Sequence, residues 1–110
     1  MAPDLRMILT ETEKRTALRG KRFCGEHFTK VDLAGAVFDE ADLEGGYFAL
    51  TDLYGADFRH TNLRQATFCL CDLHGVDLTE ACLAGTTFRS CLGLSPAICA
   101  YIHAHGGLVL

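Results

Sequence analysis

A five-residue period in large apolar side chains constrains this chain more than any other feature. From Phe23 to Phe88 every fifth residue is leucine or phenylalanine, although these two types make up only 23 of the 110 residues. A helix repeats every 3.6 residues and a strand every 2, so neither explains the period. The period fits a chain that turns a corner every five residues. Four sides then close a square coil of 20 residues.

Two further positions of the five are restricted. The residue two places before each centre, from Val31 to Cys91, is never larger than valine. The residue directly before the centre is often Asp or Asn, as at Asp52, Asn62 and Asp72. Each side of the coil should therefore point one large and one small residue inward. Successive coils should pair their backbones as parallel strands do, with a rise of about 4.8 Å per coil.

These units resemble a known repeat. Ala41-Asp42-Leu43-Glu44-Gly45 and Ala56-Asp57-Phe58-Arg59-His60 are similar to the A-[DN]-[LF]-x-x signature of pentapeptide-repeat proteins. The resemblance covers about residues 21–92 and implies an all-β solenoid, a right-handed quadrilateral parallel β-helix. We expect an N-terminal cap or helical segment over 1–22, about 3.5 coils over 23–92, and a C-terminal helix and tail over 93–110. Lys21 and Glu26 stand where small residues belong, so the first coil should be imperfect or capped.

The 20-residue coil predicts which core residues stack. Two opposite walls carry mostly phenylalanine and the other two carry leucine. The predicted core consists of Phe28, Phe48, Phe68 and Phe88 on one wall, Phe38, Phe58 and Leu78 on the wall opposite, and Leu33, Leu53, Leu73, Leu43, Leu63 and Leu83 on the remaining two. Glycine recurs two residues after the leucine centres, which predicts type II turns with positive φ there. Gln65 breaks this rule and predicts a strained or differently typed corner.

The period ends at Gly93, and a helix is predicted next. Ser95 is a good N-cap and is followed by Pro96, and Gly106 suits the C-terminal cap. Ile98, Tyr101 and Ile102 form an apolar stripe along this helix, either as a lid over the last coil or as a homodimer contact. The apolar tail 108–110 would need a partner or remain loose.

A second helix is predicted near the N-terminus, from Asp4 to about Arg19. Tyr47, Leu50 and Leu70 should point outward from the coils. They offer either a dock for residues 5–18 of this helix or a site for a partner. Isolated exposed apolar residues are the simpler interpretation.

Outward residues one coil apart should form ladders. The register predicts Asp39 over Arg59, Glu44 over Arg64, Tyr54 over His74, and a column of Glu40, His60 and Glu80. The chain carries net charge −4, but residues 1–22 alone are positive and the rest is acidic. A candidate acidic face therefore comprises Asp39, Glu40, Asp42, Glu44, Asp52 and Asp57. A solvated surface is the alternative.

No catalytic or ligand-binding motif is present in the sequence. We expect no enzyme activity, no cofactor, no metal, no direct nucleic-acid contact and no membrane span. The six cysteines include no C-x-x-C pair and no secretory signal is evident, so we expect reduced thiols in the cytoplasm.

The leading interpretation is a non-enzymatic scaffold that presents flat rigid walls to an unidentified protein partner. The resemblance also implies an alternative, because some family members are quinolone-resistance proteins or gyrase inhibitors. This chain would then be a DNA-mimicking modulator of a type II topoisomerase such as DNA gyrase, dimeric through its C-terminal helix. A module that works only when attached to another domain is a third interpretation.

Overall fold

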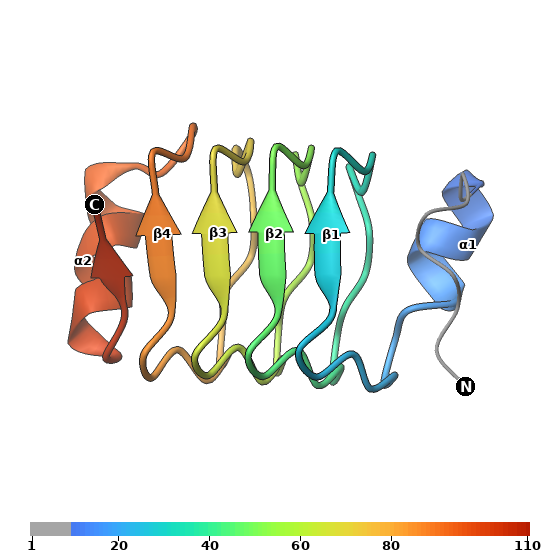
Figure 1. Cartoon of the computed structure of the whole chain (residues 1–110), viewed down its shortest axis with the longest axis horizontal. Coiled ribbons are helices and arrows are strands. Elements are labelled where there is room, and N and C mark those ends of the chain that lie inside the picture. The colour runs from blue at the N-terminus through green and yellow to red at the C-terminus, as the bar shows by residue number, and fades with distance from the viewer. Residues whose placement is uncertain (1–9) are drawn as a thin grey trace.

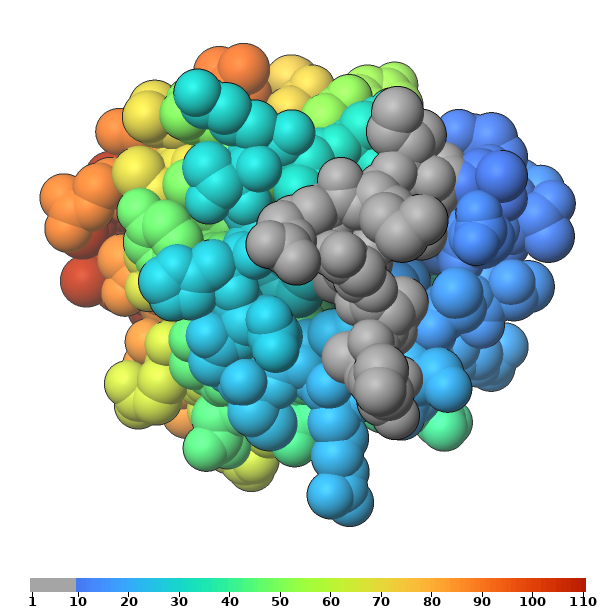
Figure 2. Space-filling model, turned by 45° about the vertical axis from the view of Figure 1, so that its right-hand side comes forward, coloured from blue at the N-terminus to red at the C-terminus, as the bar shows by residue number. Residues whose placement is uncertain are grey.

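The computed structural model describes residues 10–110 and shows a stack of coils with a helix at each end (Figure 1). Five parallel strands form one sheet in chain order. The elements are α1 (Glu11–Thr16), β1 (His27–Thr29), β2 (Tyr47–Ala49), β3 (Thr67–Cys69), β4 (Thr87–Arg89), α2 (Pro96–Ala104) and β5 (Leu108–Val109). In the space-filling view the successive coils form adjoining bands of colour (Figure 2).

The strand register confirms the 20-residue coil. Phe28 pairs with Phe48, Phe48 with Phe68, and Phe68 with Phe88. The other walls are joined by single parallel bridges with the same spacing, such as Asp32 to Asp52. The fold is therefore the four-sided parallel β-helix that the sequence predicts.

The predicted core residues all lie inside the coils. Leu78, with 6% of its surface exposed, is the least buried of them, and most of the others are fully buried. Along one wall Phe48 and Phe68 stack nearly parallel, with ring centroids 4.7 Å apart. Across the core Phe38 meets Phe48 edge to face at 6.2 Å. Both arrangements are favourable for aromatic pairs and fill the square cross-section.

Every corner of the coil uses a left-handed backbone, not only the glycine corners. Gly55 has φ 68°, as a type II turn requires, but Glu40 and His60 follow phenylalanine centres and have φ 63° and 56°. The positive φ predicted at the glycine corners is therefore confirmed, and the corners after the phenylalanine centres share it. At Gln65 φ is 60°, so the backbone of this corner is left-handed like that of the equivalent glycine corners. Because glutamine has a Cβ atom, this conformation is strained.

The recurrent Asp and Asn residues have a structural role at the turns. Asp52 Oδ1 accepts a hydrogen bond from the Tyr54 N–H at 3.0 Å, and Asn62 does the same for Arg64. The equivalent bond recurs at Asp32, Asp42, Asp57, Asp72 and Asp77. Each of these side chains satisfies an amide that points out of the coil.

The N-terminal helix is shorter than predicted. α1 begins after Thr10, whose side chain and that of Glu13 form a capping box. Leu18 is fully buried and Gly20 takes a corner conformation, so the coils begin before the expected boundary at residue 22. Residues 5, 8 and 9 of the predicted helix lie outside the described residues.

α1 lies at the end of the stack, beyond β1, and not alongside β2 and β3, the strands that directly precede Leu50 and Leu70 (Figure 1). The Val37 N–H of the first coil donates to the Lys14 carbonyl. The Lys14 ammonium is almost fully buried and lies 3.2 Å from both Glu11 and Asp32. For the described part of the helix, the predicted dock on the Leu50 and Leu70 column is therefore wrong.

The C-terminal segment closes much of the opposite end. α2 starts at the predicted cap, where Ser95 accepts a hydrogen bond from the Ile98 N–H. Ile102 is completely buried. The apolar tail is not loose, because β5 pairs with β4 and extends the Phe88 wall.

Candidate functional site: outer walls and C-terminal end

The six carboxylates of the candidate acidic face do not form one surface. The register places Asp42 and Glu44 on the Leu43 wall and Asp52 on the Leu53 wall opposite. Asp39, Glu40 and Asp57 belong to the Phe38 wall and its corner. Of these, only 7% of the Asp39 side chain is exposed, because Arg19 and His60 cover it. A continuous acidic face is therefore wrong.

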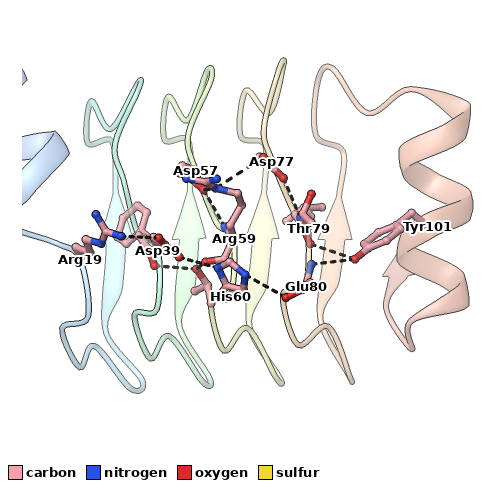
Figure 3. A network of polar contacts seen from close by, with 12 residues as sticks. Arg19, Asp39, Asp57, Arg59, His60, Asp77, Thr79, Glu80 and Tyr101 are labelled. Atoms are coloured by element: carbon pink, nitrogen blue, oxygen red, sulfur yellow. Dashed lines mark hydrogen bonds and ion pairs between the residues drawn. The ribbon is translucent and has the colours of Figure 1, made fainter.

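A line of polar contacts runs along the coils from one end toward the other (Figure 3). Asp39 accepts a hydrogen bond from Arg19 at 3.0 Å and lies 3.0 Å from His60 Nδ1. His60 Nε2 lies 3.0 Å from Glu80. The contact with His60 lowers the pKa of Asp39, with a further contribution from Arg19. Asp39 in turn raises the pKa of His60, and Glu80 adds to this effect.

Some outward side chains contact other partners than the ones the register predicts. Arg59 does not pair with Asp39; it binds Asp57 at 2.9 Å and approaches Asp77 at 3.9 Å. Glu44 accepts a hydrogen bond from Asn62, not from Arg64. In the column of Glu40, His60 and Glu80, the contact is between the last two.

Four exposed large apolar side chains lie on the Leu53 wall or at its corner, beside the Asp52 and Asp72 carboxylates of the same wall. Leu50 and Leu70 lie at its corner and are 50% and 54% exposed. Tyr54 and Leu92 project from the wall itself and are 59% and 63% exposed. We call these four residues the apolar wall. Tyr47, in contrast, lies on the neighbouring Phe48 wall, half-buried beside His27.

Leu92 was missed as a surface residue, although the sequence holds a signal for it. It occupies the position before the interrupted centre at Gly93, where the repeat elsewhere favours Asp or Asn. Its backbone still bridges Asp72, so it is held on the last rung of this wall. The Tyr54 and His74 rings lie 6.2 Å apart and are tilted by 34°, so they are neighbours without close stacking.

The three residues of the predicted stripe on α2 have different roles. Ile102 packs inside the chain against the last coil. The Tyr101 hydroxyl donates to the Leu78 carbonyl and accepts from the Glu80 N–H, both at 3.3 Å. Ile98 and Tyr101 line an open hollow of about 450 Å³ between α2 and residues 75–79.

The described residues offer neither a cluster suited to a metal ion nor a helix suited to a membrane. From residue 10 onward, no group of three or more His, Cys, Asp or Glu side chains is placed to hold a metal ion. Within the same range, no helix has the length and apolarity needed to cross a bilayer.

Comparisons with known proteins give the family. A model of pentapeptide repeats matches eight copies over residues 14–48 and 51–89. No curated protein matches the sequence.

Three solved structures are similar in fold. A pentapeptide repeat protein from the Arabidopsis thaliana thylakoid lumen is 23% identical, with a TM-score of 0.35, 92% of this chain and 84% of that chain covered. QnrB1, a plasmid-mediated fluoroquinolone resistance protein, is 20% identical, with a TM-score of 0.40 and coverage of 66% and 54%. HetL, involved in heterocyst differentiation regulation in Nostoc sp. strain PCC 7120, is 20% identical, with a TM-score of 0.34 and coverage of 67% and 43%. The chain thus spans about half the length of QnrB1 and less of HetL, and it belongs to the pentapeptide repeat family.

Proposed function

We propose that this protein is a non-enzymatic interaction module that binds a protein partner through the apolar wall. The observation that carries the proposal is the gathering of Leu50, Leu70, Leu92 and Tyr54, each at least half exposed, on and beside one wall. Exposed apolar groups that lie close together mark protein contact sites more often than scattered ones do. The coil holds them at fixed spacing, so a partner meets them without first ordering the backbone.

The alternative, a DNA-mimicking modulator of a type II topoisomerase, has less support. It needs a continuous row of free carboxylates to replace the regular phosphate charges of DNA. Asp39 is covered by Arg19 and His60, and Asp52 and Asp57 each hold a turn amide. The cytoplasm remains the proposed compartment, because the six cysteines are free thiols in this fold.

Affinity capture from a cell extract, with the immobilised full chain as bait, tests the proposal. The double variant Leu50→Glu/Leu70→Glu should retain about one tenth or less of the specific partner, because two carboxylates would be desolvated at the contact. Arg64→Glu is the matched control: it makes the same change in net charge on the opposite wall and should retain the partner.

Equal retention by both variants would reject the apolar wall as the binding surface. A supercoiling assay with purified DNA gyrase distinguishes the topoisomerase role from the proposed protein-binding role. Inhibition or drug protection by the wild type that survives Leu50→Glu/Leu70→Glu would favour the topoisomerase role over the proposed one.

A further inference from the structure

One backbone ladder stops at the C-terminal end with open hydrogen-bonding groups. On the Phe38 wall, which also carries Phe58 and Leu78, Val37 bridges Asp57, and Asp57 bridges Asp77. In the last bridge the Asp77 N–H donates to Ala56 and the Phe58 N–H donates to the Asp77 carbonyl. One coil further, the same pattern would use the Val76 carbonyl and the Leu78 N–H. Neither group has a hydrogen-bond partner among residues 10–110.

The Phe48 wall is capped at this end. β5 pairs with β4, and the Val109 N–H on β5 donates to His103 Nε2. The Glu80 N–H, two residues beyond the open Leu78 N–H, is bound by the Tyr101 hydroxyl (Figure 3). The Leu83 and Gly93 N–H groups, at the ends of the two leucine walls, also lack a hydrogen-bond partner among residues 10–110, but only the rung at Asp77 adjoins the hollow beside α2.

A hollow lies directly against the open rung. Its volume is about 450 Å³, and it is lined by residues 75–79 on one side and by Ala97, Ile98 and Tyr101 of α2 on the other. Val76 and Leu78 retain 8% and 6% exposure here, whereas Phe58 below them is fully covered. The hydrophobic column of this wall thus ends with apolar surface that α2 leaves uncovered.

The outer side of the rung is acidic. The Asp57 and Asp77 side chains lie one coil apart on the outer side of this wall. Arg59 contacts both and binds Asp57 more closely. The Asp77 side chain is 46% exposed, and the nearby Glu80 side chain is 72% exposed. A residue placed beside Asp77 on a further rung would therefore be favoured if it carried a positive charge.

We propose that this edge binds one extended segment of another protein as an additional parallel rung. A basic residue of the segment bridges Asp77: its N–H donates to the Val76 carbonyl and its carbonyl accepts from the Leu78 N–H. The next residue points inward, as Leu78 does after Asp77, and places a large apolar side chain in the hollow. This site lies at the end of the stack and is independent of the apolar wall.

The probe is the blocked peptide acetyl-Gly-Thr-Lys-Leu-Thr-Gly-amide, titrated into the isotope-labelled full chain. We expect saturable NMR shifts confined to residues 75–79 and 97–101, and slowed amide exchange at Leu78. Methylation of the lysine backbone nitrogen removes the donor to Val76 and should weaken binding about tenfold. Replacement of this lysine by glutamate should weaken binding by a similar factor, because it places a carboxylate beside Asp77.

Two variants of α2 locate the site. Ala97→Trp fills the hollow from an exposed helix position and should abolish the peptide shifts. Ala100→Trp adds the same side chain at another exposed position of α2, away from the hollow lining, and should leave them unchanged.

Shifts that do not saturate, that map elsewhere, or that persist in Ala97→Trp would overturn the proposal. So would self-association: if light scattering gives a dimer that Ala97→Trp converts to a monomer, the occupant is a second copy. The two sites are distinguished by their variants. Ala97→Trp should lose peptide binding and keep partner capture, whereas Leu50→Glu/Leu70→Glu should lose partner capture and keep peptide binding.

Discussion

His60 holds Asp39 from one coil above it, with Nδ1 3.0 Å from a carboxylate that is almost fully buried. The contact raises the pKa of His60 and lowers that of Asp39. The stabilisation from His60 is therefore complete below its ordinary pKa of 6.5 and is lost as pH rises through the raised value. The stabilisation from Asp39 is present above its ordinary pKa of 3.8 and is lost as pH falls through the lowered value.

We accordingly expect the free energy of unfolding from this pair to be largest between these two ordinary pKa values. Urea denaturation at mildly acidic and at alkaline pH measures the difference. His60→Gln should reduce stability on the acidic side and make it less dependent on pH across the titration of His60. A variant with the same pH dependence as the wild type would show that the pair is not coupled to folding.

Asp52 should stabilise the fold through its turn hydrogen bond and not through its charge. Its Oδ1 accepts from the Tyr54 N–H at 3.0 Å. Asp52→Ala removes the acceptor and should lower the free energy of unfolding by about 1 kcal/mol. Asp52→Asn keeps an acceptor, removes the same charge, and should cost less than about half of that. Equal losses in urea denaturation would instead assign the effect to the carboxylate charge.

Most of the core could be predicted because the repeat fixes two things at once. The five-residue frame sets which side chains point inward, and the 20-residue coil sets which of them stack, as Phe48 does on Phe68. Leu18 occupies an inward position of the same frame but lies within the helix predicted up to about Arg19, and Glu13 stands at the preceding position of the frame. The frame marks inward positions reliably only where neighbouring units continue it.

The outer contacts were less predictable because long side chains choose among several neighbours. Arg59 reaches Asp57 on its own rung, so the register alone did not identify its partner. The burial of Asp39 depends on Arg19, which the sequence placed in a helix. β5 is too short to show a period, and its pairing follows from the chain reversal after α2.

The corner at Gln65 offers a stabilising substitution. Its φ of 60° is strained for a residue with a side chain, and the equivalent corners carry glycine. Gln65→Gly should raise the free energy of unfolding by up to about 1 kcal/mol. The substitution relieves the backbone strain, and the greater conformational entropy of glycine in the unfolded chain offsets part of this gain. Gly55→Ala is the reciprocal control: its φ is 68° and an added Cβ meets nothing within 4 Å, so strain alone should destabilise it by about 1 kcal/mol. Changes of the same sign in thermal or urea unfolding would contradict this account.

Ile102 should act as the lid of the last coil and not as a dimer contact. It is fully buried within one chain, whereas Ile98 on the same helix is half-buried at the hollow. Ile102→Ala should lower the free energy of unfolding by about 2–4 kcal/mol, because its removal leaves a cavity over the core. Ile98→Ala should cost less than half as much, since water already reaches that side chain. Both variants should keep the molar mass of the wild type by light scattering. A change of mass in Ile102→Ala at concentrations where it remains folded would assign this residue to an interface between chains.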